Sequence, residues 1–372
     1  MKKHNICYIT YQTFPAETAN SQQTISNLSC ISKNNSNVSL IFPLRERQSS
    51  ESLKDLQKFY DFKEDINISG YSHNYPFGKF KLFPRTLFHI SHYLWAKKIS
   101  KKILITNNKF DSFITRSDWV FYFLLKQNKK VTFECHQLSR LRKILLKINL
   151  KNRNAKVIFL NDELKNFFSS FISDDNSIVL HNAVDTTKFE DIKNKKQEIV
   201  FVGNLKRFNE ERDIKFIIDS FMNSDIKNIY TLKIVGGPNT SAEILNQYIL
   251  NSFSKSNIEI TGRLNRKETI EIIAKAEVGL MINNENNEHS VKYTSPLKYF
   301  EYLAGGLKII GVDFPAHRNL PYSKFIYFFK SKNLNSLTNA FNNIANIEIA
   351  PVSMEEISLD YRAKKIVDFI KG

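Results

Sequence analysis

The chain has 372 residues, 42% hydrophobic and 24% charged, which is enough apolar material for about two packed domains. This composition excludes disorder of the whole chain. The odd number and wide spacing of the cysteines (Cys7, Cys30 and Cys135) exclude a disulfide framework and a zinc pattern, and indicate a reducing compartment. Met1–Thr10 contains no apolar stretch of signal-peptide length, and no run approaches the roughly 20 residues of a membrane span. We therefore expect a cytoplasmic protein.

Short apolar runs alternate with helical patterns along the chain, which predicts two doubly wound α/β domains. The best helical stretches are Asp213–Met222, Ala242–Phe253 and Arg266–Lys275. The expected strands are Asn5–Thr10, Val38–Phe42, Ser112–Thr115, Val131–Cys135, Val157–Leu160, Ile178–Leu180, Glu198–Gly203, Thr231–Val235, Ile258–Thr261, Val278–Ile282, Lys308–Val312 and Lys324–Phe328. The segment Asp185–Gln197 lacks apolar periodicity, so the seam between the domains is expected there.

The formal net charge of +17 is concentrated in residues 79–153, where 18 Lys and Arg against three Asp and Glu leave +15. This suggests an anionic partner. Leu138, Leu141, Leu145 and Ile148 recur at helical spacing, with Arg140, Lys143, Lys147 and Lys151 mostly on another face, as in helices that lie on anionic bilayers. The alternative is that the apolar stripe packs on its own domain and the lysines are only solvated. Nucleic-acid binding is disfavoured because no motif for it accompanies the charge.

One block in the second half, Tyr293–Gly306, carries the strongest chemical signal. Ser295 is expected to cap a helix with Pro296 at its first position, and Gly305 and Gly306 are expected to end it. The free N–H groups of Leu297 and Lys298 would form an anion site suited to a diphosphate. Glu301, one turn further on, would accept hydrogen bonds from ribose hydroxyls. The alternative is an ordinary capped helix.

Tyr293–Gly306 resembles the nucleotide-sugar site of the family-four glycosyltransferases, and this resemblance extends to other parts of the chain. These are retaining enzymes with two Rossmann-like domains facing across a cleft, the GT-B fold. Six further fragments resemble the family in the correct order: Ile9–Asn20, Phe133–His136, His181–Asp185, Phe201–Gly203 followed by Arg212, Lys233–Gly237 and Ile260–Leu264. The tail Tyr361–Lys365 also looks like the family's helix that crosses back to the first domain.

The resemblance implies an acceptor-binding domain at 1–185, a nucleotide-sugar-binding domain at 186–355, and a C-terminal helix at 356–372 that packs on the first domain. It implies retaining, metal-independent transfer from a nucleotide-diphosphate sugar to a lipid-linked or polysaccharide acceptor in bacterial surface-glycan synthesis, without a further cofactor. Together with the basic segment 79–153, this predicts a peripheral location on the inner face of the plasma membrane. The implied catalytic residues are His136, Glu301 and Arg212; the donor side adds Gly203, Lys206, Arg207, Gly236, Arg263, Leu264, Ser295, Pro296, Leu297 and Lys298, and the acceptor side is Thr18, Ala19 and Asn20.

The chain departs from the family at two points. Tyr293 stands where the first of two spaced glutamates is expected, so Glu285 or Glu288 would have to substitute for it. The family's pair of basic residues after Gly203 is also altered. Arg212 stands where the family has the lysine of this pair, so Lys206 or Arg207 would have to take the place of its arginine.

Four alternatives stay open on the sequence. His136 could be a structural histidine at a strand end. The whole chain could be a nucleotide-sugar epimerase, which shares the architecture, a basic nucleic-acid-binding protein, or a catalytically inactive scaffold.

Overall fold

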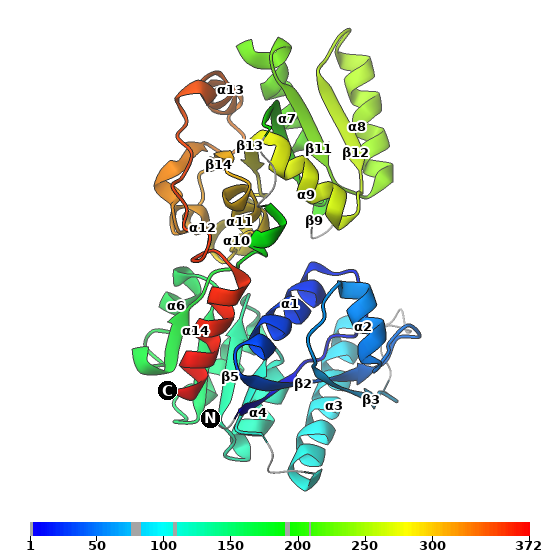
Figure 1. The fold of residues 1–372 in the computed structure, drawn as a ribbon, viewed down its shortest axis with the longest axis vertical. Coiled ribbons are helices and arrows are strands. Elements are labelled where there is room, and N and C mark those ends of the chain that lie inside the picture. Colours follow the sequence, from blue (N-terminus) through cyan, green and yellow to red (C-terminus); the bar gives the residue numbers. More distant parts are fainter. Residues whose placement is uncertain (1–2, 76–82, 107–109, 190–193, 208–209) are drawn as a thin grey trace. The chain divides into compact units, whose positions relative to one another are not determined.

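The computed structural model describes residues 3–75, 83–106, 110–189, 194–207 and 210–372 (Figure 1). It divides into two units. Unit 1 comprises Met1–Leu180 and Leu359–Gly372, and unit 2 comprises His181–Ser358. The first crossing between units thus lies a few residues before the expected position of 185, and the second a few residues after 355. No helix of the described part is long and apolar enough to cross a membrane.

Unit 1 contains a seven-stranded sheet in which all strands run parallel, in the order β3-β2-β1-β4-β5-β6-β7. Its central strands are buried on both faces, as the continuous apolar runs predict. The polar edge strand β3 has no such run and escaped the sequence prediction. The strands are β1 (His4–Ile9), β2 (Ser36–Leu44), β3 (Asn67–Ser72), β4 (Ser112–Thr115), β5 (Val131–Cys135), β6 (Ala155–Phe159) and β7 (Ser177–Val179).

Helices cover both faces of this sheet. Helices α1, α2 and α14 lie over one face, and α3, α4 and α5 neighbour one another over the other (Figure 1). Because α14 follows unit 2 in the chain, unit 1 is built from two separate segments. The helices are α1 (Ala19–Lys33), α2 (Leu53–Tyr60), α3 (Pro84–Thr106), α4 (Asp118–Lys126), α5 (Arg140–Asn149), α6 (Asp162–Phe168) and α14 (Leu359–Lys371).

Unit 2 contains a six-stranded parallel sheet, ordered β12-β11-β8-β13-β14-β15, and a short antiparallel pair, β9 with β10. The last strand begins two residues later than predicted because Ser323–Phe325 forms a 3-10 turn. The strands are β8 (Lys196–Val202), β9 (Lys206–Arg207), β10 (Glu210–Glu211), β11 (Thr231–Val235), β12 (Ile258–Gly262), β13 (Ala276–Met281), β14 (Lys308–Val312) and β15 (Ile326–Phe329).

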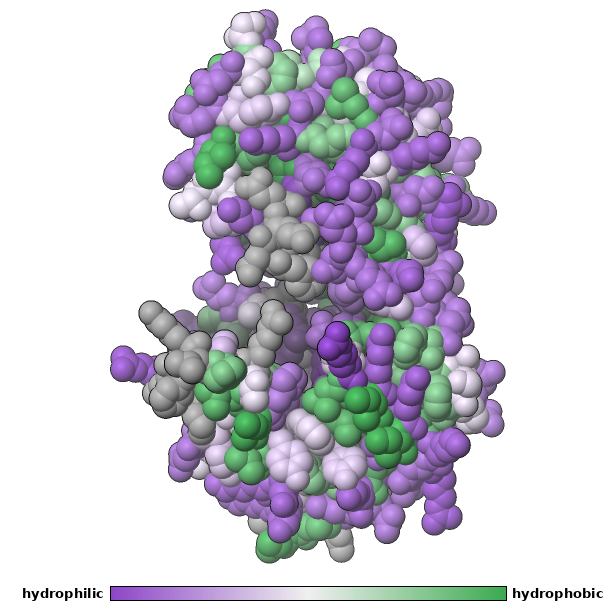
Figure 2. Space-filling view, turned by 180° about the vertical axis from the view of Figure 1, so that it is seen from behind, coloured by the Kyte–Doolittle hydropathy of each residue, from purple (hydrophilic) through white to green (hydrophobic). Residues whose placement is uncertain are grey.

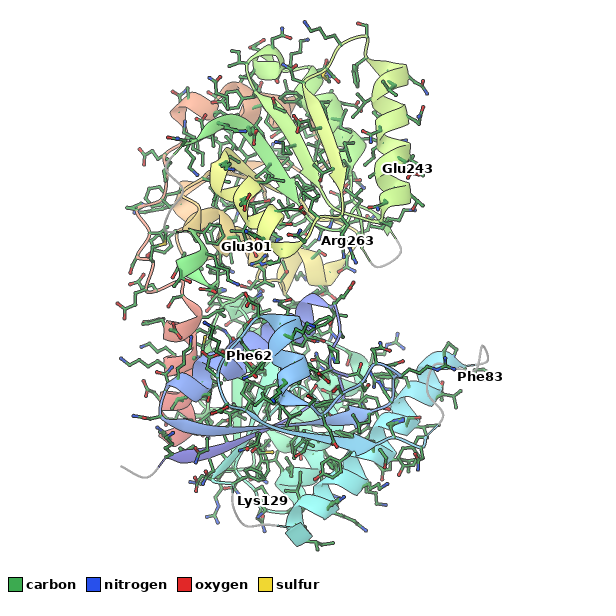
Figure 3. All side chains as sticks on the ribbon, turned by 45° about the vertical axis from the view of Figure 1, so that its right-hand side comes forward. Phe62, Phe83, Lys129, Glu243, Arg263 and Glu301 are labelled. Carbon is green, nitrogen blue, oxygen red and sulfur yellow. The ribbon has the colours of Figure 1, made fainter. Side chains whose placement is uncertain are left out.

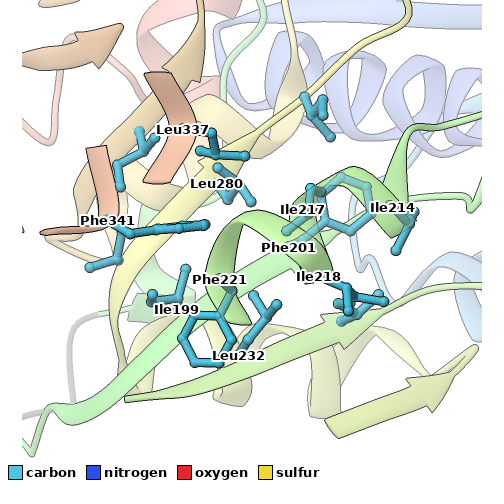
Figure 4. Packing of buried hydrophobic residues seen from close by; sticks show 14 of the residues in the cluster. Ile199, Phe201, Ile214, Ile217, Ile218, Phe221, Leu232, Leu280, Leu337 and Phe341 are labelled. Carbon is cyan, nitrogen blue, oxygen red and sulfur yellow. The ribbon is translucent and has the colours of Figure 1, made fainter. Parts of the chain in front are cut away.

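The two faces of the unit 2 sheet carry separate apolar layers. On one face, α7, α8 and α13 pack on β8 and β11 through side chains such as Phe201, Phe221 and Phe341 (Figure 4). On the other, α9 and α11 pack through Ile273, Tyr299 and Phe300. The helices are α7 (Ile214–Met222), α8 (Asn239–Ser252), α9 (Arg266–Lys275), α10 (Glu288–Lys292), α11 (Leu297–Ala304), α12 (Pro315–Arg318) and α13 (Leu334–Asn342).

Each sheet has one point where the strand order reverses direction. In unit 1 this point lies between β1 and β4, and in unit 2 between β8 and β13. In open α/β sheets, ligands bind beyond the carboxyl ends of the strands at such a point. The topology therefore directs the search for a site to the residues that follow β1 and β4, and to those that follow β8 and β13.

Candidate functional site

Helix α11 is anchored to the unit 2 sheet by a buried tyrosine at its centre. The Val202 N–H donates to Tyr302 Oη at 3.1 Å, and the Tyr302 ring lies on Gly279, where a Cβ would approach the ring to 2.5 Å. Burial raises the pKa of the Tyr302 hydroxyl, so it stays protonated. These contacts hold α11 against the ends of β8 and β13, the reversal point of the sheet.

The start of α11 differs from the sequence prediction. The helix begins at Leu297 with Pro296 as its N-cap residue, and the Ser295 side chain does not cap it. Ser295 Oγ instead accepts a hydrogen bond from Asn182 N at 3.1 Å, and Asn182 Nδ2 donates to the Ser295 carbonyl. The Ser295 hydroxyl therefore bonds the backbone of Asn182, which is distant in sequence, and not the N–H groups at the start of α11. The predicted end of the helix is confirmed, since Gly305 is the C-cap residue of α11 and Gly306 has φ +65°.

Glu301 is buried, with 3% of its surface exposed, and two cations hold its carboxylate. Arg266 Nη1 lies 2.6 Å from Oε1, and Lys298 Nζ lies 2.7 Å from Oε2. Burial alone would raise the pKa of Glu301, but Lys298 and Arg266 together lower it. Both oxygens are therefore engaged inside the protein, whereas the sequence analysis expected them to meet ribose hydroxyls. Figure 3 shows Glu301 and Arg263 at the same edge of unit 2.

Small residues let the loops after β8 and β11 approach each other closely. A Cβ on Gly236 would lie 1.8 Å from the Gly203 carbonyl oxygen, and a Cβ on Gly203 would lie 2.7 Å from Arg212 Nη1. The Arg212 guanidinium thus covers Gly203, and it also lies over the Phe201 ring at 5.8 Å from the centroid. Arg212 N donates to the Leu205 carbonyl at 2.9 Å, which ties this arginine to the same loop. The predicted trio of Gly203, Gly236 and Arg212 is brought together.

Two other donor-side residues predicted from the sequence, Lys206 and Arg263, are exposed. Lys206 is exposed on β9, and the side chain of Arg207 lies outside the described residues. Arg263 is exposed, with its N–H donating to Asn239 Oδ1 at 3.1 Å, while Leu264 is half-buried against the α9 and α11 layer.

Neither expected substitute for the missing glutamate has a free side chain. Glu285 forms an ion pair with Lys332 at 2.9 Å, and Glu288 forms one with Lys292 at 3.5 Å, one turn along α10. Tyr293 itself is buried.

Unit 1 places a buried charge network at the carboxyl ends of β4 and β5. Glu134, 3% exposed, meets Arg116 Nε at 2.9 Å and Arg362 Nη2 at 3.3 Å, and it accepts a hydrogen bond from the Tyr8 hydroxyl at 3.0 Å. Burial would raise the pKa of Glu134, but Arg116 and Arg362 lower it far below the usual range. His136 follows on the same strand end, half-buried, and burial together with Arg116 lowers its pKa well below the ordinary value. His136 is therefore neutral near pH 7.

The expected acceptor-side residues lie at the start of α1. Thr18 is the N-cap residue, its side chain accepting from Ser21 N at 3.1 Å, and Asn20 Oδ1 accepts a hydrogen bond from Arg116 Nη1. The side chain of Ala19 lies outside the described residues. Sequence reasoning gave Arg116, Arg266 and Arg362 no part in a site. Arg116 was counted only within the basic segment 79–153, Arg362 lay within a fragment that suggested the family, and no local pattern marks Arg266.

Among the residues that the structure describes, no three His, Cys, Asp or Glu side chains are grouped so that they could hold a metal ion.

No protein-family model and no curated protein matches the chain, whereas many solved structures do. A glycosyltransferase from Rickettsia africae ESF-5 superposes with a TM-score of 0.70 at 15% identity, over 100% of this chain and 98% of that one. WaaG, a glycosyltransferase involved in lipopolysaccharide biosynthesis, superposes with 0.60 at 12% identity, over 99% and 100%. The Neisseria meningitidis UDP-GlcNAc 2-epimerase, bound to UDP-GlcNAc, gives 0.59 at 13% identity, over 99% of each chain.

The chain has the GT-B fold. Two parallel Rossmann-like sheets of seven and six strands, each with helices on both faces, match these structures over essentially their full lengths. The GT-B fold expected from the sequence is thereby confirmed. Because both glycosyltransferases and an epimerase share it, the fold alone does not select the reaction.

Proposed function

We propose that the protein is a retaining, metal-independent glycosyltransferase that takes a sugar from a nucleotide-diphosphate donor. The observation that carries the proposal is Arg212, which lies over Gly203 directly after β8, the strand whose last residue, Val202, is bonded to Tyr302 of α11. The first N–H groups of a helix have no acceptor within the helix, and the helix dipole adds positive potential. A diphosphate is the ligand that this combination suits.

In this proposal these residues of unit 2 stabilise the departing nucleotide. Arg212 and the N–H groups of Leu297 and Lys298 would receive the negative charge that develops on the diphosphate as the glycosidic bond breaks. The sugar would pass through an oxocarbenium-like state, as in other glycosyl transfers. Glu301 would act by holding Lys298 and Arg266 in place. His136, neutral near pH 7, would orient a sugar hydroxyl as a hydrogen-bonding partner.

The experiment is a thermal-shift screen against UDP-, GDP-, ADP- and CMP-sugars. A ligand that binds only the folded protein raises its melting temperature. We expect one nucleotide class to stabilise the protein, and Arg212→Ala to weaken that binding at least tenfold. Arg318→Ala removes an exposed arginine of unit 2 that pairs with Asp313, and serves as the matched control. Equal affinity in the Arg212 and Arg318 variants would contradict the assigned donor site.

The epimerase is the second candidate, because an epimerase is among the structures of the same fold. It would release free, epimerised sugar from the nucleotide sugar when no acceptor is added. A transferase would instead need an acceptor to turn over. Incubation of the best-binding nucleotide sugar without acceptor, followed by analysis of the released sugar, separates the two.

We further propose that the acceptor belongs to a cell-surface glycan and is lipid-linked, and that unit 1 lies on the inner face of the plasma membrane through α3, α4 and α5. Ile90 and Leu94 of α3 are 49% and 37% exposed, and Ile144 and Ile148 of α5 are 58% and 65% exposed. The sequence analysis put Ile148 on the apolar stripe with Leu145. Leu145 is buried, whereas Ile148 faces outward with Ile144, so this helix has apolar side chains on both sides.

Aromatic and basic side chains accompany these exposed residues. Tyr93 meets the Trp119 ring edge-on at 4.9 Å, and Lys97 lies 6.0 Å from the Tyr93 ring centre. Apolar side chains interrupt the hydrophilic surface of unit 1 in Figure 2. Tyrosine and tryptophan favour the membrane–water interface, and each lysine near an anionic surface adds about 1 kcal/mol. Lys79, Lys81 and Lys109 of the basic segment lie outside the described residues, as does the side chain of Arg85.

Binding to vesicles tests this surface. The protein is expected to bind vesicles that contain anionic lipid, less so as salt rises, and replacing Lys97, Lys98, Lys101 and Lys102 by Gln should weaken binding at least tenfold. Ile148→Asn should also weaken it, because it removes apolar area from the surface. Leu250→Asn, at a 71% exposed position of α8 in unit 2, is the control. Binding that is insensitive to salt, or equal in the Ile148 and Leu250 variants, would contradict the membrane surface.

A further inference from the structure

The charge network of unit 1 leaves one arginine only partly neutralised. Arg116 has 8% of its side chain exposed and forms an ion pair with Glu134. That same carboxylate also pairs with Arg362, so one negative charge is divided between two guanidinium groups. Arg116 Nη2 is buried and has no hydrogen-bond partner within the described part of the chain. A buried donor without a partner is costly, so Nη2 favours an oxygen from outside the chain, of a ligand or of a water molecule, as its acceptor.

The start of α1 lies next to this arginine. Asn20 is in the first turn of α1, and it accepts a hydrogen bond from Arg116 Nη1. The helix has 15 residues and no acidic side chain in its first turn, so its N-terminal N–H groups and dipole add positive potential without a countercharge from that turn. Arg116 follows β4 and α1 follows β1, which places both at the reversal point of the unit 1 sheet.

We propose that Arg116 and the first turn of α1 bind an anionic group, a phosphate or a carboxylate, of the acceptor. The identification of this ligand as the acceptor rests on the proposed transfer function, whereas the anion site stands on unit 1 alone. Glu134 occupies Nε of Arg116 and Asn20 occupies Nη1, so Nη2 is the donor that would meet an oxygen of either anion. Asn20, which is exposed, and Glu134, which is buried, hold the guanidinium through Nη1 and Nε.

Calorimetric titration with inorganic phosphate, at constant ionic strength, tests the site. Asn20→Asp places a carboxylate beside Arg116 Nη1 at an exposed position that tolerates substitution. It should lower the affinity for phosphate at least tenfold by repulsion and by competition for the guanidinium. Asn37→Asp makes the same charge change at another exposed position of unit 1, and is expected to leave the affinity unchanged. All titrations are repeated with Arg212→Ala, so that phosphate bound in unit 2 is not counted.

Further arms identify the source of the anion. Glucose 1-phosphate and glucuronate represent soluble acceptors, and vesicles containing phosphatidic acid represent a lipid headgroup. An Asn20→Asp defect with the soluble probes assigns the site to an acidic or phosphorylated sugar, and a defect with vesicles alone assigns it to a lipid phosphate. Equal phosphate affinity in the Asn20 and Asn37 variants, or the absence of phosphate binding when Arg212 is replaced, would overturn the anion site. Nucleotide-sugar binding by the Asn20 variant is measured in parallel, so failure of the donor proposal is seen separately.

Discussion

Buried ionisable side chains of this protein are held in defined protonation states by neighbours far away in sequence. Glu301 lay within the block that the sequence marked, yet its partner Arg266 is on α9 and carries no motif. Arg116 and Arg362 meet on Glu134 although one follows β4 and the other belongs to α14. A sequence pattern contains information about residues one or two helical turns apart. Glu301 could therefore be predicted as a site residue, whereas its ionic partner Arg266 could not.

His317 makes the stability of unit 2 depend on pH. It is fully buried, its Nδ1–H donates to the Val312 carbonyl at 2.8 Å, and Asn283 Nδ2 lies 3.3 Å from Nε2. Burial lowers the pKa of His317 from 6.5 to about 4. Between these values the unfolded chain binds a proton that the folded chain does not, so stability is full above pH 6.5 and falls as the pH drops toward 4. The loss from this residue should be about 3 kcal/mol.

Urea unfolding of unit 2 between pH 7 and 4 measures this effect. His317→Gln should flatten the dependence, while His89→Gln, at an exposed position of α3, should keep it. An identical pH slope in the wild-type and His317→Gln proteins would show that the histidine is not the group responsible.

At the scale of elements, apolar periodicity predicted almost every central strand within about two residues, and α9 with its bounds unchanged. The errors have a common physical cause. Edge strand β3 is half-exposed and carries no apolar run, and Ser295 was expected to cap α11 but is engaged by Asn182. The missed strand and the wrong cap both depend on which distant residues pack against the element. The local sequence pattern carries no information about those residues.

The contact between the loops after β8 and β11 should tolerate no side chain. Gly236→Ala would drive a Cβ into the Gly203 carbonyl, so the loops must separate. We expect a loss of about 2–3 kcal/mol in unfolding free energy and weaker nucleotide-sugar binding, because Arg212 rests on Gly203. Gly306→Asn is the control: nothing lies within 4 Å of the added atom, and asparagine tolerates the positive φ, so less than about 1 kcal/mol should be lost. Denaturant unfolding compares the two, and equal losses would contradict the close approach.

For the whole molecule, the sequence predicted two doubly wound domains and a returning helix, and unit 1 does include α14. Ala363, Ile366 and Val367 of this helix belong to the same apolar cluster as Ile25 and Leu28 of α1. Lys156 Nζ also donates to the Phe369 carbonyl at 2.7 Å.

Ending the chain at Ser358 should therefore destabilise unit 1 by several kcal/mol and spare unit 2. The truncation exposes an apolar face and leaves Glu134 with one guanidinium fewer. Hydrogen exchange should show faster exchange in β1 and β2 and unchanged protection in β8 and β11. The variant Arg362→Met keeps the apolar contacts of α14 and should fall between the truncated and the full-length chain. Equal protection of β1 in the truncated and full-length proteins would contradict the structural role of α14.

Unit 1 is made of two chain segments with unit 2 between them, and this determines the order in which the two units can fold during translation. Residues 1–180 leave the ribosome long before α14 is translated, so the apolar groove for this helix stays open while all of unit 2 is made. Unit 2, which is continuous in the chain, can complete its core first. The apolar face of unit 1 that receives α14 is thus uncovered during that interval, and a helix made after unit 2 completes the unit made before it.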